Sequence, residues 1–518
     1  MTLKKSLPFA ALLFGLLPPL ALAPFNYWPL MVVGIAGAIW LSYSARSTKQ
    51  ALWLGWLFGV SFFGVGVSWV YGSMQTVDTP VLLAILLTLI FCCSLALFFA
   101  FQFWFFNRFL KNLPWALSLI APLWWLINEW LREWVLTGLP WLYAGYAALP
   151  LAMSQLAAVI GVYGLGLVFA FCASWLVLAV RRFRSGDNPI ASKPLIAALL
   201  LFVITNLLGA LLPATLWTKD DQVLKVAAIQ SNIDQKTKWS NSQQADTLKF
   251  YAEALTHTER VDLMLWPEAA MTRLEQDIFS FITSIDSYAE LQDTALLLGI
   301  VSTDGEHYFN SLKAYGRADG EYLKQHLVPF GEYVPLERYL RGLIQFFDLP
   351  MSTMQPALTT QTPILAESRN GPYFIAPVIC YEAAYPNLVR KLAKDANIIS
   401  VVSNDAWFGD SIGPHQHLQI TQMRAIENAR PMVRATQNGI SAIIDANGNI
   451  LSRSAQFVEA TLTGEITLQQ GKTPFQHYST HSLPILAMMI LVLIYFRHST
   501  PVQRLAALSL QLVQRFKR

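Results

Sequence analysis

The chain has 518 residues, of which 54% are hydrophobic and only 14% carry a charge. Soluble proteins carry about 25% charged residues, so this composition excludes an ordinary soluble protein and indicates an integral membrane protein. The formal net charge of +4 comes from basic residues that flank apolar segments, which makes nucleic-acid binding a poor explanation for it.

Eight apolar segments are candidates for membrane-spanning helices, because a helix needs about 20 mostly apolar residues to cross a bilayer. They cover residues 7–23, 27–43, 51–71, 81–106, 115–131, 152–180, 194–216 and 482–496. The stretch 132–151 contains Trp and Pro residues, and we expect it to be re-entrant or interfacial. The sequence thus predicts an N-terminal transmembrane domain over residues 1–219 and a C-terminal span with a basic tail over residues 481–518.

The charged residues of the connections predict how these spans are oriented. Alternate connections and the tail are basic, through Lys4, Lys5, Arg46, Lys49, Arg108, Lys111, Arg181, Arg182, Arg184, Lys193, Arg497, Arg504, Arg515, Lys517 and Arg518. The opposite connections carry almost nothing basic, and Arg132, the exception, is flanked by Glu129 and Glu133. Because basic loops stay in the cytoplasm, seven crossings place residues 220–480 outside and the eighth returns the tail.

A cleavable signal peptide is the alternative interpretation of residues 1–23. A basic start, an apolar stretch and Ala21-Leu22-Ala23 fit its outline. Pro24 directly after the expected cleavage point disfavours cleavage, and removal of this span would invert the orientation that the later loops support. We therefore expect residues 1–23 to remain as the first span.

Residues 220–480 have the pattern of an α/β domain that is long enough to bury its own core. Short apolar runs predict strands at residues 223–229, 263–266, 295–301, 374–379 and 398–402. Helical stretches separate several of these runs. Local strand pairing is expected over 308–325 and 440–452, where Asn447-Gly448 favours a hairpin turn. The domain is therefore expected to be a mixed sheet layered with helices.

Three ionisable residues follow or adjoin these runs, where the catalytic groups of such sheets gather. Glu268 follows the run 263–266, Cys380 ends the run 374–379, and Lys324 lies between two apolar patches. A cysteine nucleophile needs a base for its proton and a cation for the oxyanion, and a carboxylate and an ammonium supply both. Taken singly, each residue has an ordinary alternative as a solvated side chain or an inert buried thiol.

Cys380 is singled out further by its place in the chain. The other cysteines, Cys92, Cys93 and Cys172, lie inside apolar spans, so none is expected to form a disulfide with it. A lone thiol at the end of a strand-like run is a candidate nucleophile. The sequence contains no metal-binding or phosphate-binding motif, so no cofactor is expected.

The catalytic motifs resemble those of a known family. The segments 266–268 and 379–382, together with the segment around Lys324, are similar to the Glu-Lys-Cys motifs of the nitrilase superfamily. Fusion to seven-plus-one spans resembles the apolipoprotein N-acyltransferase family over essentially the full length. Further motifs that carry the resemblance lie at residues 326–335, 403–409, 423–427 and 434–436. Three departures, at Tyr385, Ala429 and Gln437, fall outside the positions assigned to catalysis.

This resemblance implies an αββα sandwich of the nitrilase type on an eight-helix membrane bundle. It implies that Cys380 takes the sn-1 acyl chain of a phospholipid, typically phosphatidylethanolamine, as a thioester. The α-amine of an S-diacylglyceryl-cysteine at the N-terminus of an apolipoprotein then takes the chain as an amide, which completes lipoprotein maturation. Such an enzyme lies in the bacterial inner membrane, with its catalytic domain, residues 220–480, on the periplasmic side.

The resemblance also implies roles for individual residues. Glu268 would be the general base, and Lys324 would hold the oxyanion together with a backbone N–H near Tyr381. Glu332 would orient Lys324 or the reacting groups. Four further positions match the family, namely Trp239, Tyr381, Glu382 and Asn310. Their expected roles are substrate access or site shape, and the alternative is plain packing.

A membrane-embedded acyl donor requires apolar loops at the site entrance. The segments 343–351 and 406–410 are the candidates, with Gly409 and Gly413 as hinges, and plain core packing or interfacial anchoring is the alternative for both. Two other classes of protein remain open. A membrane-tethered nitrilase-like amidase on a soluble substrate would share the triad without needing eight spans. A non-enzymatic membrane scaffold is disfavoured by the intact triad.

Overall fold

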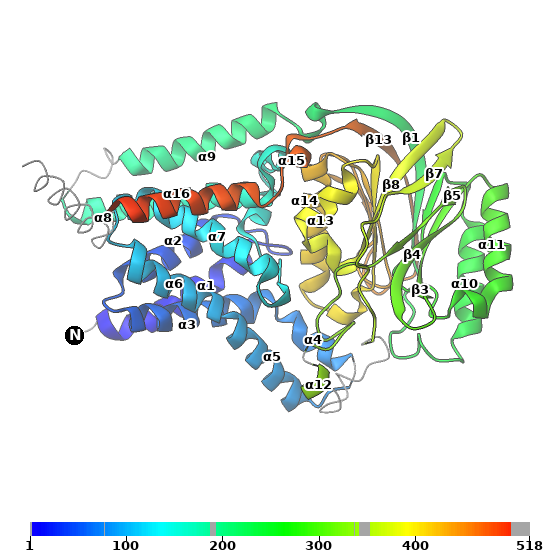
Figure 1. Cartoon of the computed structure of the whole chain (residues 1–518), viewed down its shortest axis with the longest axis horizontal. Coiled ribbons are helices and arrows are strands. Elements are labelled where there is room, and N and C mark those ends of the chain that lie inside the picture. The colour runs from blue at the N-terminus through cyan, green and yellow to red at the C-terminus, as the bar shows by residue number, and fades with distance from the viewer. Residues whose placement is uncertain (1–2, 77, 187–192, 336, 341–352, 499–518) are drawn as a thin grey trace, which may run out of the picture.

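The computed structural model describes residues 3–76, 78–186, 193–335, 337–340 and 353–498. Along its long axis a helical half is followed by an α/β half (Figure 1). Both ends of the described chain belong to the helical half, because α16 (Ser482–His498) contacts α7 (Ala121–Trp134). The α/β half is therefore inserted between the seventh and eighth apolar segments of the sequence.

Every apolar segment predicted from the sequence contains a helix. Besides α7 and α16 these are α1 (Leu3–Leu20), α2 (Pro29–Ser44), α3 (Thr48–Gly66), α4 (Trp69–Gln75), α5 (Val81–Leu95), α6 (Leu97–Phe105), α8 (Ala157–Arg184) and α9 (Lys193–Leu211). Among the described residues, three helical stretches are long and apolar enough to cross a membrane, namely Val81–Leu110, Ala152–Arg184 and Lys193–Leu211. The pair α3 and α4, bent by 55°, makes a fourth if it counts as one span.

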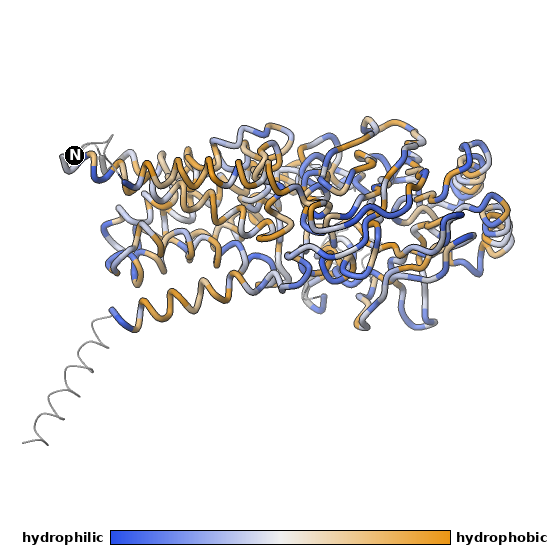
Figure 2. The backbone as a smooth tube through the Cα atoms, turned by 90° about the horizontal axis from the view of Figure 1, so that it is seen from above, coloured by the Kyte–Doolittle hydropathy of each residue, from blue (hydrophilic) through white to orange (hydrophobic). Residues whose placement is uncertain are grey.

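The surface of the helical half suits a lipid environment. Figure 2 shows long apolar stretches along its helices, whereas apolar and polar residues mix in the α/β half. The outward faces of α5 and α9 are apolar, and Leu82 and Leu199 on them are 80% and 62% exposed. Apolar patches of this extent are unusual on soluble monomers.

The α/β half contains two sheets. The first has the strand order β13-β1-β2-β3-β4-β6, with β1 (Thr218–Gln230), β2 (Leu263–Leu265), β3 (Ala295–Thr303), β4 (Tyr308–Gly316), β6 (Glu321–Leu323) and β13 (Ala460–Gly471). The second has the order β12-β11-β10-β9-β8-β7-β5, with β5 (Ala318–Asp319), β7 (Ile364–Ser368), β8 (Gly371–Ile379), β9 (Ile398–Ser403), β10 (Met432–Thr436), β11 (Ala442–Ile444) and β12 (Ile450–Arg453). All five predicted strands and both predicted local pairings are confirmed.

The central strands are apolar throughout because both of their faces are buried. Successive side chains of a strand point to opposite faces. On β1, Val226 and Ala228 pack between the two sheets, whereas Ala227 and Ile229 pack under the helices of the first sheet. Burial on two sides explains why these runs show no polar alternation.

Helices cover the outer face of each sheet. The first sheet is covered by α10 (Gln244–His257) and α11 (Phe279–Leu291), and the second by α13 (Pro386–Ala393) and α14 (Gly413–Asn428) (Figure 1). The layer of α13 and α14 faces the helical half, where α14 contacts α8. The order of the layers is therefore helices, sheet, sheet, helices, with the inner helical layer against the membrane-type helices.

Parallel pairing brings the candidate site residues to strand ends. In the first sheet β2 runs parallel to β1 and β3, and in the second β9 runs parallel to β8 and β10. The carboxyl ends of parallel strands lie at one edge of a sheet, where ligands and catalytic groups gather. Glu268 follows β2 and Cys380 follows β8, so each lies at such an edge.

Candidate active site

Four side chains predicted from the sequence meet in one buried cluster. Lys324 Nζ lies 3.0 Å from Glu268 Oε1 and 2.9 Å from Glu332 Oε1. Asn310 Nδ2 donates to the same two oxygens, at 2.7 Å and 2.8 Å. All four residues are at most 4% exposed. One ammonium and one amide thus hold two carboxylates together in the interior.

Local strand geometry explains how the cluster forms. Asn310 belongs to β4, and Lys324 directly follows β6, which pairs with β4. The backbone N–H of Lys324 donates to the carbonyl oxygen of Asn310, at 2.8 Å. Glu332 is fixed from the following loop, because its Oε2 accepts the N–H of Val328 at 2.8 Å.

The charges of the cluster stabilise one another. Burial would raise the pKa of the Glu268 carboxyl, but the Lys324 ammonium and hydrogen bonds from Lys324, Asn310 and the Asn404 N–H hold it below its ordinary value. Burial would likewise lower the pKa of Lys324, but Glu268 and Glu332 raise it well above its ordinary value. Glu268 is therefore a carboxylate, able to accept a proton, and Lys324 is a fixed cation.

Cys380 lies beside this cluster in an unusual backbone conformation. It directly follows β8, begins the 3₁₀ helix Cys380–Ala384, and has φ of +53°, which non-glycine residues rarely adopt. Burial, and then the negative charge of Glu268, raise the pKa of its thiol, while Lys324 and Ser403 act in the opposite direction. The thiol is thus protonated at neutral pH, so it needs a base to react.

Glu382 shapes the site rather than joining the charged cluster. Its Oε2 accepts the N–H of Ile379 at 2.9 Å, and its Oε1 accepts the N–H of Gln325 at 2.6 Å and that of His326 at 3.2 Å. Burial raises the pKa of this carboxyl to about 7. The side chain ties the turn that carries Cys380 to the segment that carries Lys324.

The other two predicted residues lie at the borders of the site. Trp239 packs in a small apolar cluster with Leu327 and Met354, and its indole N–H has no hydrogen-bond partner among the described residues. The Tyr381 hydroxyl donates to the carbonyl oxygen of Gly138, at 3.2 Å. Gly138 belongs to the stretch between α7 and α8, so Tyr381 links the site to the helical half.

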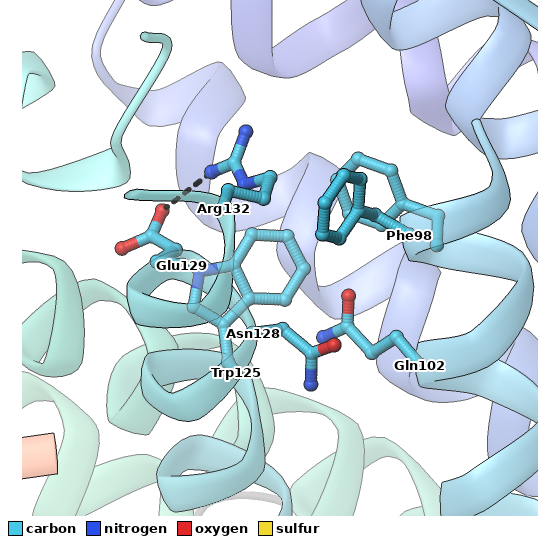
Figure 3. A pocket seen from close by; sticks show the side chains of 7 residues that line it. Phe98, Gln102, Trp125, Asn128, Glu129 and Arg132 are labelled. Carbon is cyan, nitrogen blue, oxygen red and sulfur yellow. Dashed lines mark ion pairs between the residues drawn. The ribbon is translucent and has the colours of Figure 1, made fainter. Parts of the chain in front are cut away.

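That stretch is held by charged residues within the helical half. Between α7 and α8 the chain forms the short 3₁₀ turns Val135–Thr137, which is largely exposed, and Ala144–Ala148, which is buried. Glu129 Oε1 accepts the N–H of Ala144 at 2.8 Å and pairs with Arg132 at 3.6 Å. These two side chains line a small pocket between α6 and α7 (Figure 3). The ion pair thus fixes the segment that Tyr381 contacts.

An aromatic contact joins the predicted loop 406–410 to the bent helix pair. Phe408 packs edge-on against Trp69, the first residue of α4, with ring centroids 4.8 Å apart. Gly409 has φ of +58°, which suits glycine. The other predicted entrance loop, 343–351, lies outside the described residues.

The structure adds two polar residues to which the sequence analysis assigned no role in the site. Asn404 donates its backbone N–H to Glu268 Oε2 at 2.7 Å, and it belongs to the 403–409 motif. Lys238, next to Trp239, is 2% exposed and lies 3.3 Å from the carbonyl oxygen of Glu268. Burial lowers the pKa of Lys238 to about 8. Among the described residues, no group of His, Cys, Asp and Glu side chains is arranged to hold a metal ion.

Two family models match the chain. The model described as "Carbon-nitrogen hydrolase" matches residues 225–473, and the model described as "Apolipoprotein N-acyltransferase N-terminal domain" matches residues 14–175. The first range contains every residue of the polar cluster as well as Cys380.

Similar proteins cover nearly the whole chain. It is 41% identical to the apolipoprotein N-acyltransferase of Pseudomonas aeruginosa (strain LESB58), over 93% of this chain and 94% of that protein. It is 42% identical to the apolipoprotein N-acyltransferase of Azotobacter vinelandii, over 93% of both. Among solved structures, it matches a carbon-nitrogen hydrolase from Helicobacter pylori G27 at 16% identity and a TM-score of 0.36, over 51% of this chain and 93% of that one.

Proposed function

The chain belongs to the apolipoprotein N-acyltransferase family, and from this premise we propose a thioester mechanism in which Cys380, Glu268 and Lys324 carry the acyl transfer. The enzyme is an N-acyltransferase of the nitrilase superfamily, and it acts on lipoproteins. The observation that carries the mechanism is the position of a protonated thiol beside a buried carboxylate–ammonium pair.

The first half of the reaction loads the enzyme with an acyl chain. Glu268 accepts the thiol proton while Cys380 Sγ forms a bond to the carbonyl carbon of the sn-1 ester of a phospholipid. The resulting oxyanion is stabilised by Lys324 and the Tyr381 N–H. The ester C–O bond then breaks, and the proton held by Glu268 passes to the departing glycerol oxygen. The products are a thioester on Cys380 and a lysophospholipid of the phosphatidylethanolamine type.

The second half transfers the chain to a lipoprotein. The α-amine of the N-terminal S-diacylglyceryl-cysteine attacks the thioester carbonyl and gives a proton to Glu268. The C–S bond breaks, the sulfur regains that proton, and the products are an N-acyl lipoprotein and the free thiol. Water must stay out between the two halves, since hydrolysis of the thioester would make the enzyme a lipase.

The membrane arrangement belongs to the same proposal. Residues 1–219 and 481–518 supply eight spans, and residues 220–480 form the catalytic domain on the periplasmic side of the inner membrane. This assignment is supported by the eight apolar helical segments, by the alternation of basic connections and by the apolar outward faces of α5 and α9. An acyl donor and an acceptor that are both lipid-anchored reach such a site from the bilayer.

A two-step discharge assay tests the proposed function. Purified enzyme is first incubated with phosphatidylethanolamine and freed of lipid, then given a peptide that begins with S-diacylglyceryl-cysteine. We expect the peptide to gain one acyl chain while the enzyme loses it, and the same peptide with an acetylated α-amine to leave the enzyme loaded. Continuous release of free fatty acid, unchanged by the peptide, would instead support a lipase or an amidase.

A further inference from the structure

The backbone of Cys380 has a side-chain partner that the proposed mechanism does not use. His417, on α14, places its Nε2 3.1 Å from the carbonyl oxygen of Cys380. The imidazole side chain is 1% exposed. The contact therefore joins the inner helical layer directly to the residue that bears the nucleophile, without water between them.

The protonation of this imidazole follows from its neighbours. A carbonyl oxygen only accepts hydrogen bonds, so Nε2 must carry a proton. Burial, and then the positive charge of Arg434, lower the pKa of His417, which favours the neutral ring. Nδ1 lies 3.0 Å from Asp405 Oδ1 and 3.1 Å from Arg434 Nη2, so it accepts from Arg434 in the neutral ring and donates to Asp405 in the protonated ring. In both of these states Nε2 carries a proton and donates to the carbonyl oxygen of Cys380.

Asp405 holds these side chains in place through further hydrogen bonds. Its Oδ2 accepts from Arg434 at 2.7 Å, and its Oδ1 accepts from the Ser403 hydroxyl at 2.6 Å. Ser403 in turn lowers the pKa of the Cys380 thiol. A set of fully buried side chains therefore reaches Cys380 at its carbonyl oxygen, through His417.

The carbonyl of Cys380 and the N–H of Tyr381 belong to one peptide group. That group is trans, so its C=O and N–H are coplanar and point in opposite directions. A donor that fixes the C=O therefore fixes the direction of the N–H as well. The left-handed φ of Cys380 makes this constraint necessary, because a non-glycine residue relaxes from that conformation when nothing holds it.

We propose that His417 is a positioning residue for acyl transfer: by holding the Cys380 carbonyl, it aims the Tyr381 N–H at the oxyanion. The inference rests on the proposed function, since that function assigns the oxyanion to this N–H. His417 contacts neither substrate nor the reacting sulfur. Its effect is therefore confined to steps that pass through a tetrahedral oxyanion.

Two matched substitutions separate this role from a merely structural one. The amide nitrogen of Gln lies as many bonds from Cα as Nε2 of His, whereas that of Asn corresponds to Nδ1. His417→Gln therefore keeps a donor for the Cys380 carbonyl, and His417→Asn does not. His417→Leu is a second variant without the donor, and His415→Gln, on the same helix and partly exposed, is the control.

Two reactions of Cys380 are followed by intact mass in each variant. Thioester formation from phosphatidylethanolamine passes through an oxyanion, whereas alkylation by iodoacetamide does not. We expect thioester formation in His417→Asn and His417→Leu to slow by about 10- to 100-fold, below the loss caused by deleting an oxyanion donor outright. We expect the alkylation rate to stay at the wild-type value in all variants. We expect His417→Gln and His415→Gln to form the thioester at about the wild-type rate.

Each other result has a defined meaning. The inference is overturned if alkylation slows as much as acylation in the variants without the donor. It is also overturned if acylation is unchanged in His417→Asn and His417→Leu, or if His417→Gln loses as much acylation as His417→Asn. Failure of both donor-less variants to fold while the Gln variant folds makes His417 a residue of the fold, which also overturns it. If the wild type itself forms no thioester, it is the proposed function that fails.

Discussion

Lys324 Nζ lies 3.0 Å from Glu268 Oε1 in the interior of the α/β half, where both side chains are nearly inaccessible to solvent. A buried ion pair is costly to build unless hydrogen bonds satisfy its remaining atoms. Here Asn310, Glu332 and the Asn404 backbone satisfy them. The arrangement keeps a base and a cation charged beside a neutral thiol, which is the distribution of protons that thiol acylation requires.

If Glu268 is the general base, its replacement by Gln should slow thioester formation. In Glu268→Gln the amide keeps the shape of the carboxylate and one acceptor oxygen, but its NH₂ group faces a donor and it does not accept the thiol proton. We expect thioester formation from phospholipid to fall by about 10²- to 10⁴-fold, the usual contribution of a general base. Glu253→Gln, a solvent-facing carboxylate on α10, is the control, and equal rates in the two variants would remove Glu268 from its role.

Replacement of Cys380 should affect formation of the acyl adduct very differently from replacement of the other three cysteines. Cys380→Ala should form no acyl adduct and should remain folded, because the side chain loses only one sulfur atom. The other three cysteines, Cys92, Cys93 and Cys172, lie in the helical half and should tolerate replacement by Ala with the adduct retained. The measurement is intact mass after lipid incubation. Loss of the adduct in the Cys172 variant alone would move the nucleophile away from Cys380.

Lys238 predicts a pH dependence of stability. Its pKa is about 8 in the fold and ordinarily 10.5, so the unfolded chain binds this proton more tightly. The free energy of unfolding should therefore rise between pH 8 and 10.5, and below pH 8 the full penalty of about 3 kcal/mol should apply. Apparent melting temperatures at pH 7, 8, 9 and 10 test this.

The matched variants for this prediction are Lys238→Met and Lys236→Met. The melting temperature of the wild type minus that of Lys238→Met should increase as the pH rises through this window. Lys236 is half-exposed and pairs with Asp78 on the surface, so its variant should show no such trend. A difference that stays constant with pH in Lys238→Met would contradict the assignment.

The orientation in the membrane is tested by chemical labelling of intact spheroplasts. Ser242→Cys lies on an exposed loop of the α/β half, and Ser185→Cys lies on an exposed turn at the end of α8. A membrane-impermeant thiol reagent should label the first and leave the second unlabelled until the cells are opened. Labelling of position 185 alone would invert the proposed topology.

Much of the fold was predictable because its signals are local. Runs such as 295–301 are apolar on every residue, which identifies strands buried on both faces. Glu268 and Cys380 stand where such runs end, so their place at the sheet edges follows from the sequence. Lys324 was grouped with them by its chemistry and then by the resemblance to a known family, whereas its contact with Glu268 depends on a loop far along the chain.

Other parts were not predictable from local pattern. The ring of His417 reaches Cys380 only because α14 packs across the second sheet, and nothing around residue 417 in the sequence indicates that contact. Lys238 likewise resembles a solvated lysine until the fold buries it. In the helical half, a break after Gly66 divides one predicted span into α3 and α4, which hydropathy alone does not reveal.

The central claim is that Cys380 carries the acyl chain, and intact mass of the purified protein tests it most directly. After incubation with a phosphatidylethanolamine of one defined sn-1 chain, the account predicts a mass increase of one acyl group. The adduct should map to the peptide containing Cys380 and should be released by neutral hydroxylamine, as a thioester is. An unchanged mass while the phospholipid is consumed, or an adduct on any other residue, would contradict the account.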